Sequence, residues 1–358
     1  MKIGILTFHR AINYGAVLQC YALKTALSQL GHEVKIIDYR PPYIEKYREI
    51  FSVYEFCRRD GFVAKAKYLI SCIIQSRSKY KARKVFDLFL SNNFDFTSIV
   101  KREDDIPQNL DCIIFGSDQI WSPSICDGFD KIFWGQFKHQ KQTKFISYAA
   151  SKGGHNKLDE FQKQIVKKYL QVYDSISVRE SQLKQEFEDL GCHPKLVVDP
   201  TLLLQAQIYE RMAVKPKKDN YTLLFTLEKN KYSYQFALNI ASQLKSELVV
   251  LSAMKSIRSK PNHVYEISPE EYLGYIKYAR CIICISFHAT VFSYIFRKDF
   301  YCLKSPKMDR PMNLLHMIDL EDRMVDASRY IAFSPIIYEE KQKEIALIKD
   351  SYDYLKSL

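Results

Sequence analysis

The 358-residue sequence contains no apolar run long enough to cross a membrane. A transmembrane helix needs about 20 consecutive apolar residues, and the longest ambiguous stretch, residues 68–76, is far shorter. The apolar start of the chain is interrupted by His9, Arg10 and Asn13, which does not match a secretory signal. We therefore expect a globular protein of the cytoplasm.

Paired cysteines and glycine-rich phosphate loops are also missing. The nine cysteines are scattered and form no disulfide framework, which fits a reducing compartment. Cys281 and Cys284 have the spacing of a metal pair, but residues three apart on a strand point to opposite faces. We therefore assign both to the core and predict no metal site. No G-x-G-x-x-G motif occurs, which argues against a nicotinamide cofactor, and we expect no cofactor.

Acidic residues are scarce relative to basic ones. Against 53 Lys and Arg residues stand 41 Asp and Glu residues, so the net charge is +12. Residues 46–102 alone contain 13 basic and five acidic residues, a net charge of +8. A basic, partly amphipathic helical region at residues 45–102 favours anionic lipid head groups, phosphorylated carriers or nucleic acid. A solvated helical face is the alternative.

The sequence holds no recognised nucleic-acid-binding module, so we expect no nucleic-acid partner. Peripheral association with an anionic membrane surface, at the inner face of the membrane, remains a hypothesis for the basic region.

What the sequence does contain is an alternation of apolar strands and amphipathic helices. Residues 3–7 predict a strand, residues 16–30 a helix that Gly31 ends, and residues 34–37 the next strand. These three elements form a β-α-β unit. The alternation breaks near residues 201–220 and then resumes.

Two successive alternations predict an α/β protein with two Rossmann-like lobes facing a cleft. We place the N-terminal lobe at residues 1–205, the C-terminal lobe at residues 206–335, and at residues 336–358 a helix that packs back on the N-terminal lobe.

Polar residues gather where the first predicted strands end. Asn13 and Gly15 indicate a loop where the backbone approaches another group closely, or else a plain tight turn. Asp118 follows a buried strand at residues 111–115 and is a candidate general base toward a hydroxyl, or else a helix N-cap. Trp121 is a candidate platform for a sugar ring, or else an ordinary buried tryptophan.

Cationic residues follow later strands. Arg179, held by Glu180, forms a candidate fork for a carboxylate or phosphate, unless the two make a surface ion pair. His288 lies where a strand at residues 280–285 turns into a helix, whose first N–H groups favour an anion. Lys298 follows at the far end of that helix. These residues predict a pocket for a small, multiply charged anion, with a purely structural His288 as the alternative.

Taken in order, these motifs resemble the polysaccharide pyruvyl transferase family over most of the chain. The segments that carry the resemblance are residues 13–19 (NYGAVLQ), 116–121 (GSDQIW), 177–180 (SVRE), 199–201 (DPT) and 286–293 (SFHATVFS), with Lys298 nearby.

The resemblance implies a fold of the glycosyltransferase B type, with the acceptor on the N-terminal lobe and the donor on the C-terminal lobe. It implies phosphoenolpyruvate as donor substrate, a glycan or lipid-linked sugar as acceptor, and a pyruvate ketal as product. The implied catalytic residues are His288, Asp118 and Arg179. The implied donor-binding residues are Arg179, His288, Ala289, Thr290 and Lys298, and the acceptor-binding ones are Asn13, Tyr14, Gly15, Asp118 and Trp121.

The sequence departs from the family pattern at two positions. Ile285 stands where the family usually has Asp, which removes a candidate orienting partner of His288. Ala289 stands where the family usually has Gly, which adds a methyl group where a ligand approaches the backbone. A nucleotide-sugar-dependent glycosyltransferase of the same fold, or a non-catalytic partner in glycan assembly, therefore remains an alternative.

Overall fold

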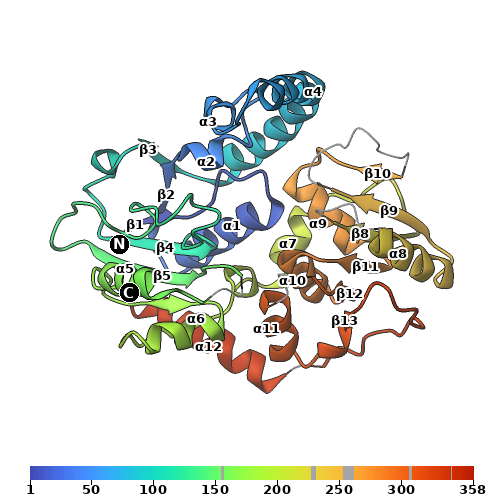
Figure 1. Ribbon diagram of the computed structural model, residues 1–358. Helices are drawn as coiled ribbons and strands as arrows, with labels where there is room; N and C mark the ends of the chain where they lie inside the picture. Colours follow the sequence, from blue (N-terminus) through green and yellow to red (C-terminus); the bar gives the residue numbers. More distant parts are fainter. Residues whose placement is uncertain (155–156, 227–230, 253–261, 306–308, 340) are drawn as a thin grey trace.

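The computed structural model describes residues 1–154, 157–226, 231–252, 262–305, 309–339 and 341–358 (Figure 1). Within these ranges the chain forms two α/β lobes, each built on one parallel sheet. The prediction of an α/β protein with two Rossmann-like lobes is confirmed.

The N-terminal lobe contains a seven-stranded sheet in the order β3-β2-β1-β4-β5-β6-β7. Its first five strands have the order typical of a Rossmann fold, in which the chain reverses direction of travel across the sheet after the third strand. The strands are β1 (Lys2–Leu6), β2 (Glu33–Tyr39), β3 (Phe96–Val100), β4 (Cys112–Asp118), β5 (Lys144–Ala150), β6 (Ser177–Val178) and β7 (Lys195–Leu196).

The C-terminal lobe repeats this topology with six strands in the order β10-β9-β8-β11-β12-β13. Its strands are β8 (Tyr221–Phe225), β9 (Glu247–Leu251), β10 (His263–Val264), β11 (Cys281–Cys284), β12 (Asp299–Leu303) and β13 (Met324–Val325). Cys281 and Cys284 are both fully buried, and they belong to two different apolar clusters on β11. Both are core residues, as the three-residue spacing on a strand predicts.

The helices connect the strands and cover the sheets (Figure 1). They are α1 (Tyr14–Gln29), α2 (Pro42–Glu45), α3 (Val53–Cys57), α4 (Phe62–Asn93), α5 (Glu160–Leu170), α6 (Ser181–Glu188), α7 (Ala206–Met212), α8 (Lys231–Gln243), α9 (Pro269–Lys277), α10 (Phe287–Ile295), α11 (Asp309–Met317) and α12 (Gln342–Lys356). Ser268 and Glu271 form a capping box that starts α9. Over the described ranges, none of the helices has both the length and the apolar character that crossing a bilayer demands.

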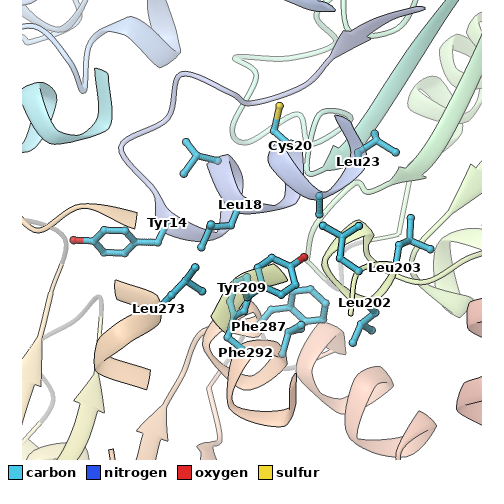
Figure 2. Close-up of a cluster of buried hydrophobic side chains, with 14 of the residues drawn as sticks. Tyr14, Leu18, Cys20, Leu23, Leu202, Leu203, Tyr209, Leu273, Phe287 and Phe292 are labelled. Carbon is cyan, nitrogen blue, oxygen red and sulfur yellow. The ribbon is translucent and has the colours of Figure 1, made fainter. Parts of the chain in front are cut away.

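The two lobes share one continuous apolar core. Helix α1 of the N-terminal lobe packs against α9 and α10 of the C-terminal lobe. Tyr14 of α1 stacks on Tyr272 of α9, with the ring centroids 4.5 Å apart. Figure 2 shows Tyr14 and Leu18 of α1 facing Leu273 and Phe292 of the C-terminal lobe. Burial of these apolar side chains from both lobes fixes the position of the loops between them.

The last helix, α12, returns from the C-terminal lobe to the sheet of the N-terminal lobe. Its Tyr354 hydroxyl donates a hydrogen bond to the Ser147 carbonyl of β5 (2.9 Å), and its Ser351 hydroxyl accepts one from the Val198 N–H (2.9 Å). Tyr354 and Ser351 are buried. The C-terminal segment therefore packs on the N-terminal lobe at β5 and at the residues that follow β7.

The backbone at Val214 passes close to Gly274 of α9, and this contact can be used to test the packing. A Cβ atom added at Gly274 would lie 1.7 Å from the Val214 carbonyl oxygen, a backbone atom that cannot rotate away. We expect Gly274→Ala to lower the free energy of unfolding by about 1 to 3 kcal/mol, as overpacking does. Chemical denaturation would measure this loss, with Ser91→Ala at an exposed position of α4 as control. Equal stability of the Gly274→Ala variant and the wild type would contradict the packing described.

Candidate active site between the lobes

The loops that follow β4, β6 and β7 meet the start of α10 between the two lobes. Arg179 follows β6, Asp199 follows β7, and His288 lies in the first turn of α10. All three side chains are at least nine-tenths buried. In parallel sheets these loops share the carboxyl edge, where ligands of open α/β proteins bind.

The Asp199 carboxylate lies next to side chains from both lobes. Arg179 donates from Nη1 to Asp199 Oδ2 at 2.5 Å, and His288 Nε2 lies 3.6 Å from the same oxygen. The other oxygen, Oδ1, accepts hydrogen bonds from the backbone N–H and the hydroxyl of Thr201. The N-terminal lobe thereby brings its guanidinium and the C-terminal lobe its imidazole to one place.

Charge pairing determines the protonation states of Asp199 and Arg179. Burial alone would raise the pKa of Asp199, but the nearby His288 and Arg179 and the hydrogen bond from Thr201 outweigh it, so the pKa lies well below its usual range. Burial likewise works against the charged form of Arg179, but Glu180, Asp199 and Asp118 raise its pKa above the ordinary value. Both groups are therefore ionised at neutral pH.

Two nitrogens of Arg179 make hydrogen bonds that orient the guanidinium, and the third makes none with a described residue. Its Nε donates to Glu180 Oε1 at 3.2 Å, so the pairing with Glu180 predicted from the sequence is confirmed. Its Nη2 lies 3.8 Å from Asp118 Oδ1 and makes no hydrogen bond with a described residue. The guanidinium also lies over the Phe287 ring, 4.8 Å from the centroid. The Nη2 amino group of this fixed guanidinium therefore points toward Asp118.

Asp118 lies at the end of β4 with a positive φ of 76°, a conformation that Asp adopts more readily than most residues. Its carboxylate is buried and lies within 3.8 Å of two guanidinium groups, those of Arg179 and Arg310. Several polar atoms in this region are buried and make no hydrogen bond with a described residue: Asp118 Oδ1, Arg179 Nη2, Glu180 Oε2 and His288 Nε2. Such a cluster is what a site for a charged ligand requires.

Arg310 completes this cationic side of the site, although no sequence motif points to it. It comes from the first turn of α11, and its Nη1 lies 3.7 Å from Asp118 Oδ1. Burial and the neighbouring Arg179 lower its pKa, although the group stays a cation because the ordinary arginine value is so high. Arg179, Asp199, Phe287 and Arg310 line one end of a cavity of about 360 Å³ between the lobes and α12.

Gly15 lies against the imidazole of His288. A Cβ atom at this position would be 2.1 Å from His288 Nδ1, so only glycine leaves room for the ring. The prediction that the backbone comes close to another group at this loop is confirmed, and that group is His288. Asn13 precedes it as the N-cap of α1, with its side-chain oxygen accepting from the N–H groups of Gly15 and Ala16.

Two residues predicted to contact the acceptor are instead part of the core. Trp121 is 1% exposed, stacks on Trp134 with centroids 4.7 Å apart, and donates from Nε1 to the Phe133 carbonyl. Its ring faces are covered, so the prediction of a sugar platform is wrong. Tyr14 is likewise buried in its stack on Tyr272, and it holds the lobes together.

Lys298 is also far from the site, contrary to the prediction that it binds the donor. At 1.5 Å per residue, α10 places Ile295 roughly 10 Å from His288, and Lys298 lies beyond it. Cys281 at the start of β11 pairs with Asp299, so Lys298 stands at the opposite edge of the sheet. A helix that follows a strand carries its C-terminal residues away from the ligand-binding edge.

The two residues after His288 face the core with their side chains. Ala289 and Thr290 are fully buried, and the Thr290 hydroxyl donates to the Ser286 carbonyl at 3.1 Å. Only the backbone N–H of Ala289, in the first turn of α10, remains for a ligand. The methyl group of Ala289 therefore lies in the core. Ile285 cannot provide a carboxylate beside His288. The carboxylate that lies there belongs to Asp199 of the other lobe.

Comparison with known proteins adds to this geometry. The sequence profile of the family described as polysaccharide pyruvyl transferase matches residues 13–305, most of the chain. The chain belongs to the polysaccharide pyruvyl transferase family. The match spans both lobes and every motif at the site, from Asn13 to the segment around His288. No curated protein shows a significant match to the sequence.

Solved structures with the same two-lobed arrangement include nucleotide-sugar epimerases. A UDP-N-acetylglucosamine 2-epimerase from Listeria monocytogenes is 11% identical with a TM-score of 0.50, over 100% of this chain and 91% of that chain. The Neisseria meningitidis UDP-GlcNAc 2-epimerase bound to UDP-GlcNAc is 12% identical with a TM-score of 0.45, over 100% and 94% of the two chains. At 11% identity, the similarity to the Listeria structure shows the fold alone, which is of the glycosyltransferase B type.

The contact between Gly15 and His288 can be tested by adding one methyl group. We expect Gly15→Ala to push the imidazole away from Asp199 and to cost about 1 to 3 kcal/mol of stability, because the neighbouring core is shared by both lobes. A crystal structure of the variant would show the displaced ring, and denaturation would give the energy. Ser28→Ala, at the exposed end of α1, serves as control. An unmoved His288 ring in the Gly15→Ala variant would contradict the contact.

The low pKa of Asp199 predicts how its contribution to stability depends on pH. A carboxyl group whose pKa is lower in the folded than in the unfolded state stabilises the fold above the unfolded value of about 3.9, and this contribution is lost as the pH falls toward the folded value. We expect Asp199→Asn to cost about 3 to 5 kcal/mol at neutral pH, since it breaks a buried ion pair. Denaturation at several pH values should show this difference shrinking below about pH 4. A difference that stays constant from neutral pH to pH 3 would contradict the assignment.

Proposed function

We propose that this protein transfers a pyruvyl group from phosphoenolpyruvate to a sugar of a cell-surface polysaccharide or its lipid-linked precursor, forming a ketal. The observation that carries the proposal is the meeting of Arg179 and His288 at Asp199, with Arg179 Nη2 and His288 Nε2 making no hydrogen bond to described residues. Phosphoenolpyruvate carries a carboxylate and a phosphate, and a locked guanidinium edge suits either group.

Arg179 can hold an anion without giving up its hydrogen bonds to Glu180 and Asp199. Glu180 and Asp199 engage Nε and Nη1 of Arg179, which leaves Nη2 for the donor. Arg310 adds a second guanidinium beside Asp118. The first backbone N–H groups of α10, at His288 and Ala289, favour a negative charge in the same region. We assign the donor to this end of the cavity.

The residue types suit the chemistry of ketal formation. His288 donates a proton to C3 of the enol, which makes C2 electrophilic, and a sugar hydroxyl adds to C2 while Asp118 accepts its proton. The C2–O bond to phosphate then breaks, and the phosphate leaves with the proton from Asp118. A second sugar hydroxyl adds to C2, closes the ketal and returns its proton to His288. These steps require no cofactor and no metal.

The positions of the two proton-transfer groups fit this sequence of steps. Asp118 belongs to the N-terminal lobe and His288 to the C-terminal lobe, with Arg179 between them. A donor held by Arg179 would have one group on each side of the reacting carbon. Because phosphoenolpyruvate is a metabolite of the cell interior, we place the reaction in the cytoplasm.

Phosphate release from phosphoenolpyruvate in the presence of an isolated glycan fraction tests the proposal. We expect His288→Gln and Arg179→Lys to lower kcat about 100-fold or more, since a positioned general acid and the charged hydrogen bond from Arg179 Nη2 to the anion are lost. Lys298→Ala is the control, because this lysine lies at the other end of α10, and its rate should stay within about twofold of the wild type. Thermal unfolding of each variant would show that it is folded.

Calorimetric titration separates this reaction from transfer of a nucleotide sugar. Phosphoenolpyruvate should bind the wild type and lose affinity in Arg179→Lys, whereas uridine diphosphate should not compete with it. If both variants keep the wild-type rate, or if uridine diphosphate binds while phosphoenolpyruvate does not, the proposed donor and site are wrong.

A further inference from the structure

The first half of α4 presents apolar side chains to solvent. Phe62 is 86% exposed and Ile73 is 75% exposed, and Val63, Ile70 and Ile74 are also more than half exposed. Phe62, Ile70 and Ile73 recur at helical spacing, so they lie on one outward face of the helix. A contiguous group of exposed apolar side chains on one helix face is a mark of an interaction surface.

The opposite face of α4 is firmly packed, so the apolar face is held outward. Tyr68 is buried and its hydroxyl accepts a hydrogen bond from the Ser52 N–H at 2.9 Å. Farther along the helix, Phe86 packs against Tyr14 of α1, with centroids 5.2 Å apart. Figure 1 shows α3 and the first part of α4 at the periphery of the molecule, away from both sheets. The helix therefore cannot bury its apolar outer face by rotating.

Basic residues continue the same outward face. Arg77, Lys81 and Lys84 follow the apolar stretch at helical spacing, and all three are exposed. Together with Lys67 they make no ion pair with a described residue. Elsewhere in the region, Arg58 and Arg83 pair with Asp127 and Asp87, respectively. The outer face of α4 thus combines an apolar segment with a set of uncompensated cations.

We propose that this outward face of α4 docks on an anionic membrane surface. Apolar side chains on a helix that lies in the interface enter the acyl boundary, and the flanking Lys and Arg side chains pair with lipid phosphates. Residues 46–102 carry a net charge of +8. Two copies of the chain that met through α4 would bring like charges together, whereas an anionic surface complements them.

This surface is joined to the active site through rigid packing. Phe86 of α4 contacts Tyr14, and the next residue, Gly15, lies against His288. A docked α4 would therefore hold the cleft in a fixed orientation to the membrane. The benefit of this orientation rests on the proposed function, because the active site would then face an acceptor sugar carried on a membrane lipid. The docking itself does not depend on catalysis.

Co-sedimentation of the full chain with phosphatidylcholine vesicles, with and without phosphatidylglycerol, tests the proposal. We expect binding only to the anionic vesicles, and weaker binding as salt rises. The Ile70→Ser/Ile73→Ser double variant should lose about tenfold in affinity, the effect of removing two inserted side chains. The Arg77→Ala/Lys81→Ala/Lys84→Ala variant should lose roughly fivefold for each charge at low salt. Phe161→Ser, a 73% exposed apolar position on α5, is the matched control and should bind like the wild type.

Several outcomes would overturn the docking proposal: no binding to anionic vesicles, equal binding of all variants, or equal loss in Phe161→Ser. A dimer in light scattering that the Ile70→Ser/Ile73→Ser variant abolishes would assign the face to a second copy instead. Salt-sensitive RNA binding without vesicle binding would assign the charges to nucleic acid. The His288→Gln variant keeps the two proposals apart, since it should bind vesicles like the wild type even though its turnover is lost.

Discussion

The carboxylate of Asp199 connects the two lobes where the site is built. It is fully buried, it pairs with Arg179 of its own lobe, and it lies 3.6 Å from His288 of the other lobe. A buried charge is tolerated only when its partners are in place, so the position of each lobe constrains the other. The shared apolar core around Tyr14 and Tyr272 supplies the burial, and the ion pairs fix the side chains within it.

The polar groups around the Asp199 carboxylate fall into two sets. Some position the side chains of the site, and others remain available to a ligand. Glu180 and Asp199 occupy two nitrogens of Arg179, and Gly15 leaves space for the imidazole of His288. Arg179 Nη2 and His288 Nε2 are buried and have no hydrogen-bond partner in the described part of the chain. Preorganised groups of this kind favour a small anion, because less side-chain entropy is lost when it binds.

Several features could be predicted from the sequence because they depend on interactions between residues that are close together in the chain. The strand-turn-helix units, the buried cysteines of β11 and the capping box of α9 all match their sequence periodicity or spacing. The pairing of Arg179 with Glu180 joins adjacent residues, and Gly15 was recognisable as a place of close approach. The predictions for Trp121 and Lys298 were wrong because a sequence motif shows neither the direction in which a side chain points nor which end of a helix lies near the site.

The sequence by itself determined the two Rossmann-like lobes and the set of strand ends at which charged residues gather, since strand and helix periods are local properties. Only the tertiary structure decided that Arg310 joins the site and that Asp199 lies beside His288 of the other lobe. It also decided that the outer face of α4 stays exposed. These outcomes depend on contacts between segments far apart in the chain, and such contacts are fixed by the packing of one lobe on the other.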